Sequence, residues 1–252
     1  MKKQLLILAA ITTMVFISCS KEKIETMETS HEEIATKKGG GGAPVNLNKG
    51  LEALFRFDGN LEEATGKLKD GVPNVFGADI YTEDRHGNPK SAINFSGRYG
   101  IDIFDIPVEM DFTVAAWVQY TPTIAPVLTT YLLKCNMVSP WILQDTTKYW
   151  GMISTPMTTG VTSPPLNGKW HHLVATYDGF EIKFYVDGSF VGNHANVAGG
   201  VYPPGTTVNY QAGYSTFPGT NIIESLWQGN MDDLRFYTRV LDAIEVQALY
   251  NF

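Results

Sequence analysis

The segment from residue 170 to 188 constrains the fold more than any other part of the chain. Two apolar and aromatic runs, residues 170–177 and 184–186, flank Asp178-Gly179, and a second Asp-Gly pair follows at Asp187-Gly188. Asp-Gly pairs supply the positive φ angles that tight hairpin turns need. Strands and turns that alternate at such short intervals are typical of an antiparallel sandwich or barrel. The sequence therefore predicts an all-β fold.

Other segments support this prediction. Residues 51–57 form the first expected strand, and residues 114–118 are apolar at both alternating sets of positions, which predicts a strand that packs on both faces. The expected helix is at the C-terminus, where Asp242 and Glu245 have the spacing of a capping box. Ile244 and Leu249 are its expected apolar residues.

Five segments carry a resemblance to a known family. In chain order they are residues 54–60, 83–97, 112–118, 170–188 and 229–237. Together they resemble the LamG-like jelly-roll domain of the concanavalin A-like lectin/glucanase superfamily, over roughly residues 47–252. The resemblance implies a two-sheet antiparallel β-sandwich with a short C-terminal helix. It does not define a function, because this fold hosts binding proteins and enzymes alike.

Residues 1–18 are typical of a secretion signal, with two lysines before an apolar run that is too short to span a bilayer comfortably. The run ends at Ser18-Cys19, which resembles the lipobox of bacterial lipoproteins, although Phe16 stands where leucine is more usual. An ordinary signal peptide with a cysteine by chance is the alternative. We expect Cys19 to carry lipid, and by resemblance Ser20 favours the outer membrane.

Residues 19–46 have the composition of a flexible tether. They are charged and poor in aromatic residues, and they end near four consecutive glycines at 39–42. Such a segment cannot bury enough apolar surface to offset its ordering entropy. We expect residues 47–252 to form one domain that stands about 25–30 Å from the membrane.

 We also expect this domain to be exposed at the cell surface, with lipid as its only membrane anchor.

Charge and cysteine content exclude other classes. The chain has a net charge of −7, which becomes −9 once residues 1–18 and their two lysines are removed. An acidic chain without a basic stripe argues against a nucleic-acid partner. With Cys19 lipidated, Cys135 has no disulfide partner, and we expect it to be a small buried side chain.

Catalytic motifs are incomplete. The glucanase branch of the superfamily uses a Glu-x-Asp-x-x-Glu strand, and the nearest match, Glu109 to Val114, lacks the third acid. Retaining hydrolysis needs two carboxyl groups about 5 Å apart. His171 and His172 are adjacent, so on a strand they point to opposite faces and cannot easily share a metal ion. We therefore predict no catalytic residues.

Two acidic segments, near the first and the last expected strands, offer hard oxygen ligands. In the family these segments meet at one rim of the sandwich and often hold calcium. The resemblance thus implies a structural calcium ion at Asp58, Asn60 and Asp232, completed by backbone carbonyls. The chain departs from the family pattern after Asn60, where Lys67 could oppose a cation and Glu63 could replace a ligand. In the alternative, Asp58 and Asp232 only cap turns.

Sugar binding needs exposed aromatic faces beside hydrogen-bonding groups. The candidates in expected irregular segments are Trp141, Tyr149, Trp150, Tyr202 and Phe217. Core packing is the alternative for each of them. The stretch 215–225 is an expected specificity loop, and Trp227 takes the place of a core aromatic in the family.

These observations predict a lipid-anchored, non-catalytic surface protein that binds a glycan or polysaccharide, near an outer-membrane uptake complex. One alternative is a protein–protein adhesion or structural module of the envelope. A glycoside hydrolase is the other. An exposed aromatic platform beside polar side chains would favour a glycan, a broad apolar patch would favour a protein partner, and two convergent carboxylates in a cleft would favour hydrolysis.

Overall fold

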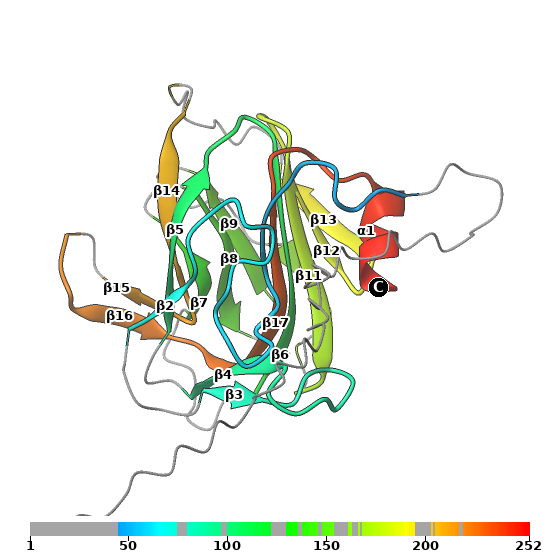
Figure 1. Cartoon of the computed structure of the whole chain (residues 1–252). Coiled ribbons are helices and arrows are strands. Elements are labelled where there is room, and N and C mark those ends of the chain that lie inside the picture. The colour runs from blue at the N-terminus through cyan, green and yellow to red at the C-terminus, as the bar shows by residue number, and fades with distance from the viewer. Residues whose placement is uncertain are drawn as a thin grey trace, which may run out of the picture. The chain divides into compact units, whose positions relative to one another are not determined.

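The computed structural model describes residues 45–252 except 75–79, 97–99, 122–129, 136–137, 146–147, 154–160, 163–165, 167, 195–202, 204 and 217–218. The described residues form two packed antiparallel β-sheets and one short C-terminal helix (Figure 1). The all-β sandwich that the sequence predicts is confirmed.

The eight-stranded sheet has the order β13-β12-β11-β6-β17-β4-β3, and β1 also pairs with β17. Its strands are β1 (Leu51–Phe55), β3 (Tyr81–Thr82), β4 (Ala92–Ser96), β6 (Phe112–Tyr120), β11 (Trp170–Tyr177), β12 (Ile182–Val186), β13 (Ser189–His194) and β17 (Gln228–Tyr237). Strands distant in sequence are therefore neighbours at its centre, because β6 lies between β11 and β17.

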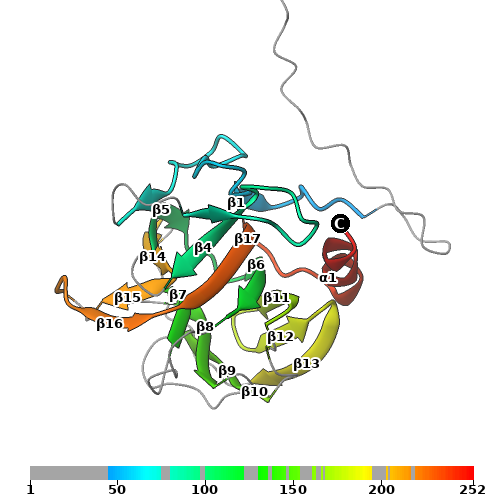
Figure 2. The same cartoon turned by 90° about the horizontal axis from the view of Figure 1, so that it is seen from below.

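The seven-stranded sheet has the order β10-β9-β8-β7-β14-β5-β2. Its strands are β2 (Val72–Pro73), β5 (Ile101–Pro107), β7 (Thr130–Lys134), β8 (Val138–Asp145), β9 (Lys148–Ile153), β10 (Val161–Thr162) and β14 (Thr207–Ala212). A separate hairpin, β15 (Tyr214–Thr216) and β16 (Ile223–Leu226), projects from the sandwich (Figure 2). The segment 215–225, expected to be a loop, is thus largely this hairpin.

The hairpin expected from residues 170–188 is present as β11 and β12. At its turn, Gly179 has a φ of 85°, and the Asp178 carboxylate accepts hydrogen bonds from two backbone N–H groups, those of Phe180 at 3.1 Å and Glu181 at 2.7 Å. The next turn uses Asp187 and Gly188 at φ of 50° and 75°. The two Asp-Gly pairs therefore end their strands as the sequence predicts.

Strand β6 packs on both faces, as expected from its unbroken apolar sequence. Val114, Ala116 and Val118 belong to the core between the sheets, whereas Ala115 belongs to a second apolar cluster under the helix. Trp227 is fully buried in the main core, and Cys135 is buried with 4% of its surface exposed. Both agree with their expected roles.

Helix α1 (Ala243–Tyr250) lies against the outer face of the eight-stranded sheet (Figure 2). Its capping box is formed, because Asp242 and Glu245 exchange side-chain and backbone hydrogen bonds. Val246 and Leu249 are its buried residues. Ile244 was expected to belong to the apolar face, and this expectation is wrong, because Ile244 is 70% exposed. Val246 lies two positions later and is buried, and residues two positions apart point in nearly opposite directions from the helix axis. Among the described residues, none of the helices is long and apolar enough to cross a membrane.

Candidate functional site

The aromatic candidates for sugar binding are placed on two neighbouring strands. Trp141 lies on β8, opposite Leu133 of β7, and Trp150 lies on β9, opposite Ile142 of β8. Tyr149 is also on β9. The expectation that these residues lie in irregular segments is wrong. Pro140, which suggested a chain break, sits within β8 where the pairing register shifts between Ser139 and Ile142, and an irregularity of this kind accommodates a residue without an N–H.

Strands β8 and β9 thus bring two tryptophan positions together at one end of the seven-stranded sheet. The side chains of Trp141, Tyr149 and Trp150 lie outside the described part of the structure, as do Tyr202 and Phe217 altogether. Their role in binding stays a prediction.

Polar side chains also lie on β5 and β14 of the same sheet. Asn209 on β14 is exposed, and its side-chain oxygen accepts a hydrogen bond from the Asp105 backbone N–H at 3.1 Å. The Tyr214 hydroxyl donates a hydrogen bond to the Asp102 carboxylate. Burial, together with this carboxylate, raises the pKa of Tyr214. The sheet therefore carries the exposed Asn209 amide on β14 and the Asp102 carboxylate on β5, and groups of these kinds bind sugar hydroxyls.

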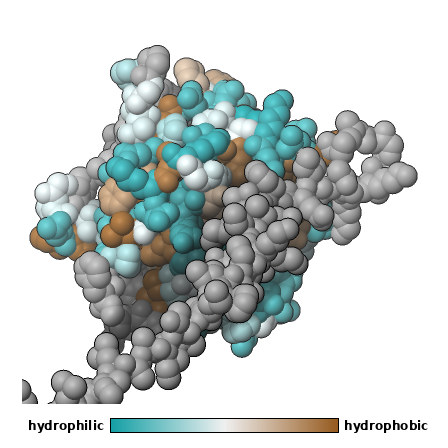
Figure 3. Space-filling view, in the orientation of Figure 1, coloured by the Kyte–Doolittle hydropathy of each residue, from teal (hydrophilic) through white to brown (hydrophobic). Residues whose placement is uncertain are grey.

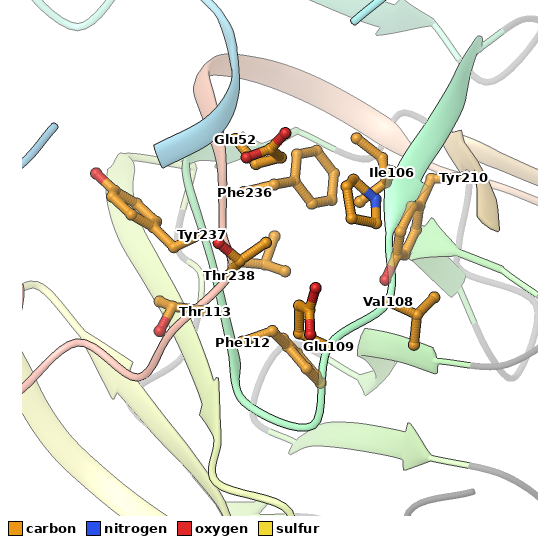
Figure 4. Close-up of a pocket in the computed structure, with 12 residues that line it drawn as sticks. Glu52, Ile106, Val108, Glu109, Phe112, Thr113, Tyr210, Phe236, Tyr237 and Thr238 are labelled. Carbon is orange, nitrogen blue, oxygen red and sulfur yellow. The ribbon is translucent and has the colours of Figure 1, made fainter. Parts of the chain in front are cut away.

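A hollow of about 370 Å³, part of it open solvent, lies at the rim between the sheets (Figure 4). Its walls are mostly apolar and aromatic, and two acids, Glu52 and Glu109, approach from β1 and from the β5–β6 connection. Glu52 is already paired with Lys67, whose Nζ lies 3.2 Å from its carboxylate. Glu52 was not predicted from the sequence, because an acid in a first strand carries no catalytic signature by itself.

The incomplete glucanase motif does not form a catalytic strand. Glu109 and Asp111 are exposed residues of the β5–β6 connection, and Val114 is 1% exposed within the main core. The glucanase arrangement requires all three acids to alternate along one strand. The described residues of this motif therefore do not reproduce it.

The predicted calcium ligands are in different surroundings. Asp58 and Asn60 are exposed after β1, and the Asn60 side-chain oxygen accepts a hydrogen bond from the Glu62 backbone N–H at 3.1 Å. Asp232 on β17 is 4% exposed, and its carboxylate lies 2.6 Å from the Arg85 guanidinium. Burial and the neighbouring Asp233 carboxylate raise the pKa of Asp232, while Arg85 opposes that rise.

Asp232 therefore does not fit the predicted ion well, because the Arg85 guanidinium already binds its buried carboxylate. Among the residues that the structure describes, no group of three or more His, Cys, Asp or Glu side chains is arranged to hold a metal ion. Calcium at Asp58, Asn60 and Asp232 stays a prediction that must compete with Arg85.

Glu63 has a role that the sequence analysis did not assign. Its side chain is 6% exposed, and its carboxylate accepts hydrogen bonds from the backbone N–H groups of Leu54, Thr65, Lys67 and Leu68 and from the Thr65 hydroxyl. The Lys67 ammonium donates a hydrogen bond to the Leu51 carbonyl at 2.6 Å. Glu63 and Lys67 therefore both stabilise the loop after β1. The only signal for this role in the sequence was the Thr65-Gly66 pair close to an acidic residue.

The adjacent histidines have separate surroundings, as expected. His171 Nδ1 lies 2.8 Å from the Asp187 carboxylate. The His172 ring is buried beside Trp117 and Tyr250, with ring centroids at 5.1 and 6.2 Å. Within the described part of the chain, His172 Nδ1 has no hydrogen-bond partner. Burial, and to a lesser degree two nearby arginines, lower the pKa of His172 to about 3, so its ring is neutral at physiological pH.

Solved structures share this fold. Domain 4 of AbnA, a GH43 extracellular arabinanase from Geobacillus stearothermophilus solved in complex with arabinotriose, has 24% identity and a TM-score of 0.61, over 79% of this chain and 98% of that one. A Trypanosoma rangeli sialidase in complex with 2,3-difluorosialic acid has 21% identity and a TM-score of 0.58, over 86% of this chain. The match spans only 34% of the sialidase chain.

No curated protein sequence matches the chain. A family model does, and it describes the concanavalin A-like lectin/glucanases superfamily, with residues 101–247 matched. This match covers more than half of the chain and includes strands β5 to β17, from both sheets, and most of α1. The chain belongs to the concanavalin A-like lectin/glucanases superfamily.

Proposed function

We propose that the chain is a non-catalytic glycan-binding protein, held at the outer membrane by lipid on Cys19 and exposed at the cell surface. One observation carries the proposal: the arabinanase domain solved with arabinotriose is matched over 98% of its length. That domain is a part of an enzyme and shares the fold of this chain. A sandwich of this size is therefore a sufficient framework for contact with an oligosaccharide.

The proposed ligand is an oligosaccharide, bound on the seven-stranded sheet near Trp141 and Trp150. These residues are on adjacent strands, and a carboxylate, Asp102, and an amide, Asn209, lie on β5 and β14 of the same sheet. Aromatic rings stack on the apolar faces of sugars, and polar groups define orientation. One stacking residue contributes only a few kcal/mol, so many anchored copies would be needed for strong retention.

The absence of a catalytic pair among the described residues of the glucanase motif supports binding rather than hydrolysis. The third position of that motif is the buried Val114. Hydrolysis of a glycosidic bond uses two carboxyl groups on either side of it. Among the described residues, Glu52 and Glu109 line the rim hollow and are a further pair to test. Under this proposal wild type and Glu109→Gln should retain the glycan equally, and neither should release reducing sugar from it.

The test is a glycan array with the full chain, followed by affinity electrophoresis with the best ligand. Trp141→Ala or Trp150→Ala should abolish retention with little change in melting temperature. Phe180→Ala is the matched control, because Phe180 is an aromatic residue 57% exposed on the other sheet. If both tryptophan variants keep wild-type retention, the binding surface lies elsewhere; if no glycan binds across a broad array, the proposal fails.

A protein partner is the second candidate, and one observation favours it. Ile222 and Ile223 on the projecting β15–β16 hairpin are 64% and 47% exposed, and apolar surface is visible on this hairpin (Figure 3). Solvent-facing isoleucines on a protruding element are common at protein contacts. Ile222→Ser with Ile223→Ser should weaken such a contact and leave glycan retention unchanged.

A further inference from the structure

Two consecutive acids lie where the last strand is irregular. The pairing of β17 with β6 shifts register between Asp232 and Arg235, and Asp233 has a φ of 47°. The side chains of Asp232 and Asp233 are only 5% and 16% exposed. Two neighbouring carboxylates repel each other and lose hydration on burial, so this arrangement requires a positive charge nearby.

Arg85 supplies that charge from a distant part of the chain. One guanidinium nitrogen lies 2.6 Å from the Asp232 carboxylate, and the other lies 3.0 Å from that of Asp233. The Arg85 side chain is 11% exposed, and its guanidinium lies 4.8 Å from the centre of a Trp117 ring. The contact joins residues 147 positions apart in sequence.

The loop that carries Arg85 is held in place by its neighbour. The Asp84 carboxylate accepts hydrogen bonds from the backbone N–H groups of His86 at 2.7 Å and Asn88 at 2.8 Å, and from the Asn88 side chain at 2.8 Å. Gly87 closes the turn with a φ of 83°. The guanidinium is therefore presented by an ordered turn rather than by a long free side chain.

Other charges around the pair add to this balance without replacing Arg85. Arg235 on β17 is 3% exposed and lies 3.7 Å from the Asp233 carboxylate, a longer distance than either Arg85 contact. His172 is uncharged at physiological pH. The 2.6 Å contact between Arg85 and Asp232 is the shortest of these three ion pairs.

We propose that the Arg85 guanidinium takes the part of a bound cation at Asp232 and Asp233, where it joins the 83–90 turn to β17. Asp232 is one of the three residues for which the family resemblance implied calcium. A guanidinium stays charged at all physiological pH values, and its two parallel donors fit two carboxylates. The rim is then ordered without metal. A divalent cation enters only when Arg85 is absent, because Asp232 and Asp233 would then be left buried without their main partner.

The experiment compares thermal unfolding of the full chain in excess EDTA and in millimolar calcium chloride. Wild type should melt at the same temperature in both. Arg85→Ala should melt about 5–15 °C lower in EDTA, and calcium should raise its melting temperature by several degrees. Adding Asp232→Asn and Asp233→Asn to Arg85→Ala should remove this calcium response. His86→Ala, an exposed side chain of the same turn, is the matched control and should melt like wild type.

Two results would overturn the proposal. The first is a wild type that loses stability in EDTA or retains calcium in elemental analysis after dialysis, since a metal would then share the site. The second is a folded Arg85→Ala protein that does not respond to calcium. If Arg85→Ala does not fold, Arg85→Lys, which keeps the charge and loses the paired donors, takes its place: it should melt below wild type, and melting identical to wild type would overturn the proposal. The elemental analysis of wild type is independent of any variant.

Discussion

His172 should make the stability of the fold depend on pH between about 6.5 and 3. Its ring is buried beside Trp117 and Tyr250, and burial, with Arg235 and Arg85 nearby, lowers its pKa to about 3. The same ring has a pKa of about 6.5 in the unfolded chain. Because the folded pKa is the lower one, the unfolded state binds the proton more tightly. The contribution of His172 is therefore complete above pH 6.5 and is lost as the pH falls toward 3.

The magnitude follows from the two pKa values. Each pH unit within that window changes the free energy of unfolding by about 1.4 kcal/mol. Lowering the pH from 7.5 to 5 crosses about 1.5 units of the window, so His172 should cost about 2 kcal/mol. His172→Phe keeps an aromatic ring between Trp117 and Tyr250 and removes the titrating group, so it should lack this loss.

The assay is urea unfolding of the full chain at pH 7.5 and at pH 5, followed by tryptophan fluorescence. The drop in unfolding free energy between these pH values should be larger in wild type than in His172→Phe by about 2 kcal/mol. All other titrating groups are present in both proteins, so their contributions largely cancel in this comparison. Equal pH dependence in the two proteins would refute the buried, neutral state of His172.

Two further predictions concern the anchor and the loop after β1. Cys19→Ala should release the protein from the membrane fraction or block its maturation, because two or three acyl chains are needed for stable attachment; retention of a cleaved Cys19→Ala protein in that fraction would contradict the lipid anchor. Glu63→Gln should destabilise the fold by about 2–4 kcal/mol, because an amide NH₂ would face N–H and O–H groups whose hydrogen bonds the carboxylate now accepts. Thermal unfolding beside the exposed-neighbour control Glu62→Gln measures this, and identical melting of the two variants would argue against it.

Local patterns explain why much of the fold could be predicted. The β11–β12 hairpin follows from two Asp-Gly pairs between apolar runs, and the helix start follows from Asp242 and Glu245. These signals act within a few residues, so they are visible without knowing what else the chain contacts. The predicted apolar face of α1 was wrong at Ile244, because the face that a short helix buries depends on the sheet beneath it.

Contacts between distant segments could not be predicted in the same way. Arg85 and Asp232 are 147 positions apart, and their pairing depends on β3, β4 and β17 being neighbours in one sheet. Trp141 was assigned to an irregular segment because Pro140 precedes it, yet a shift in strand register absorbs that proline. Neither the sheet order nor the position of a register shift is encoded in a local pattern.

The segments that reveal the family and the residues proposed to bind glycan lie on different sheets. The five family segments contribute β1, β4, β6, β11, β12 and β17, all of them strands of the eight-stranded sheet. Trp141 and Trp150 lie on β8 and β9 of the other sheet. The turns, ion pairs and buried residues of the first sheet maintain the framework, so they carry the recognisable sequence. The second sheet contributes none of these five segments, so a change of ligand there would leave all five unaltered.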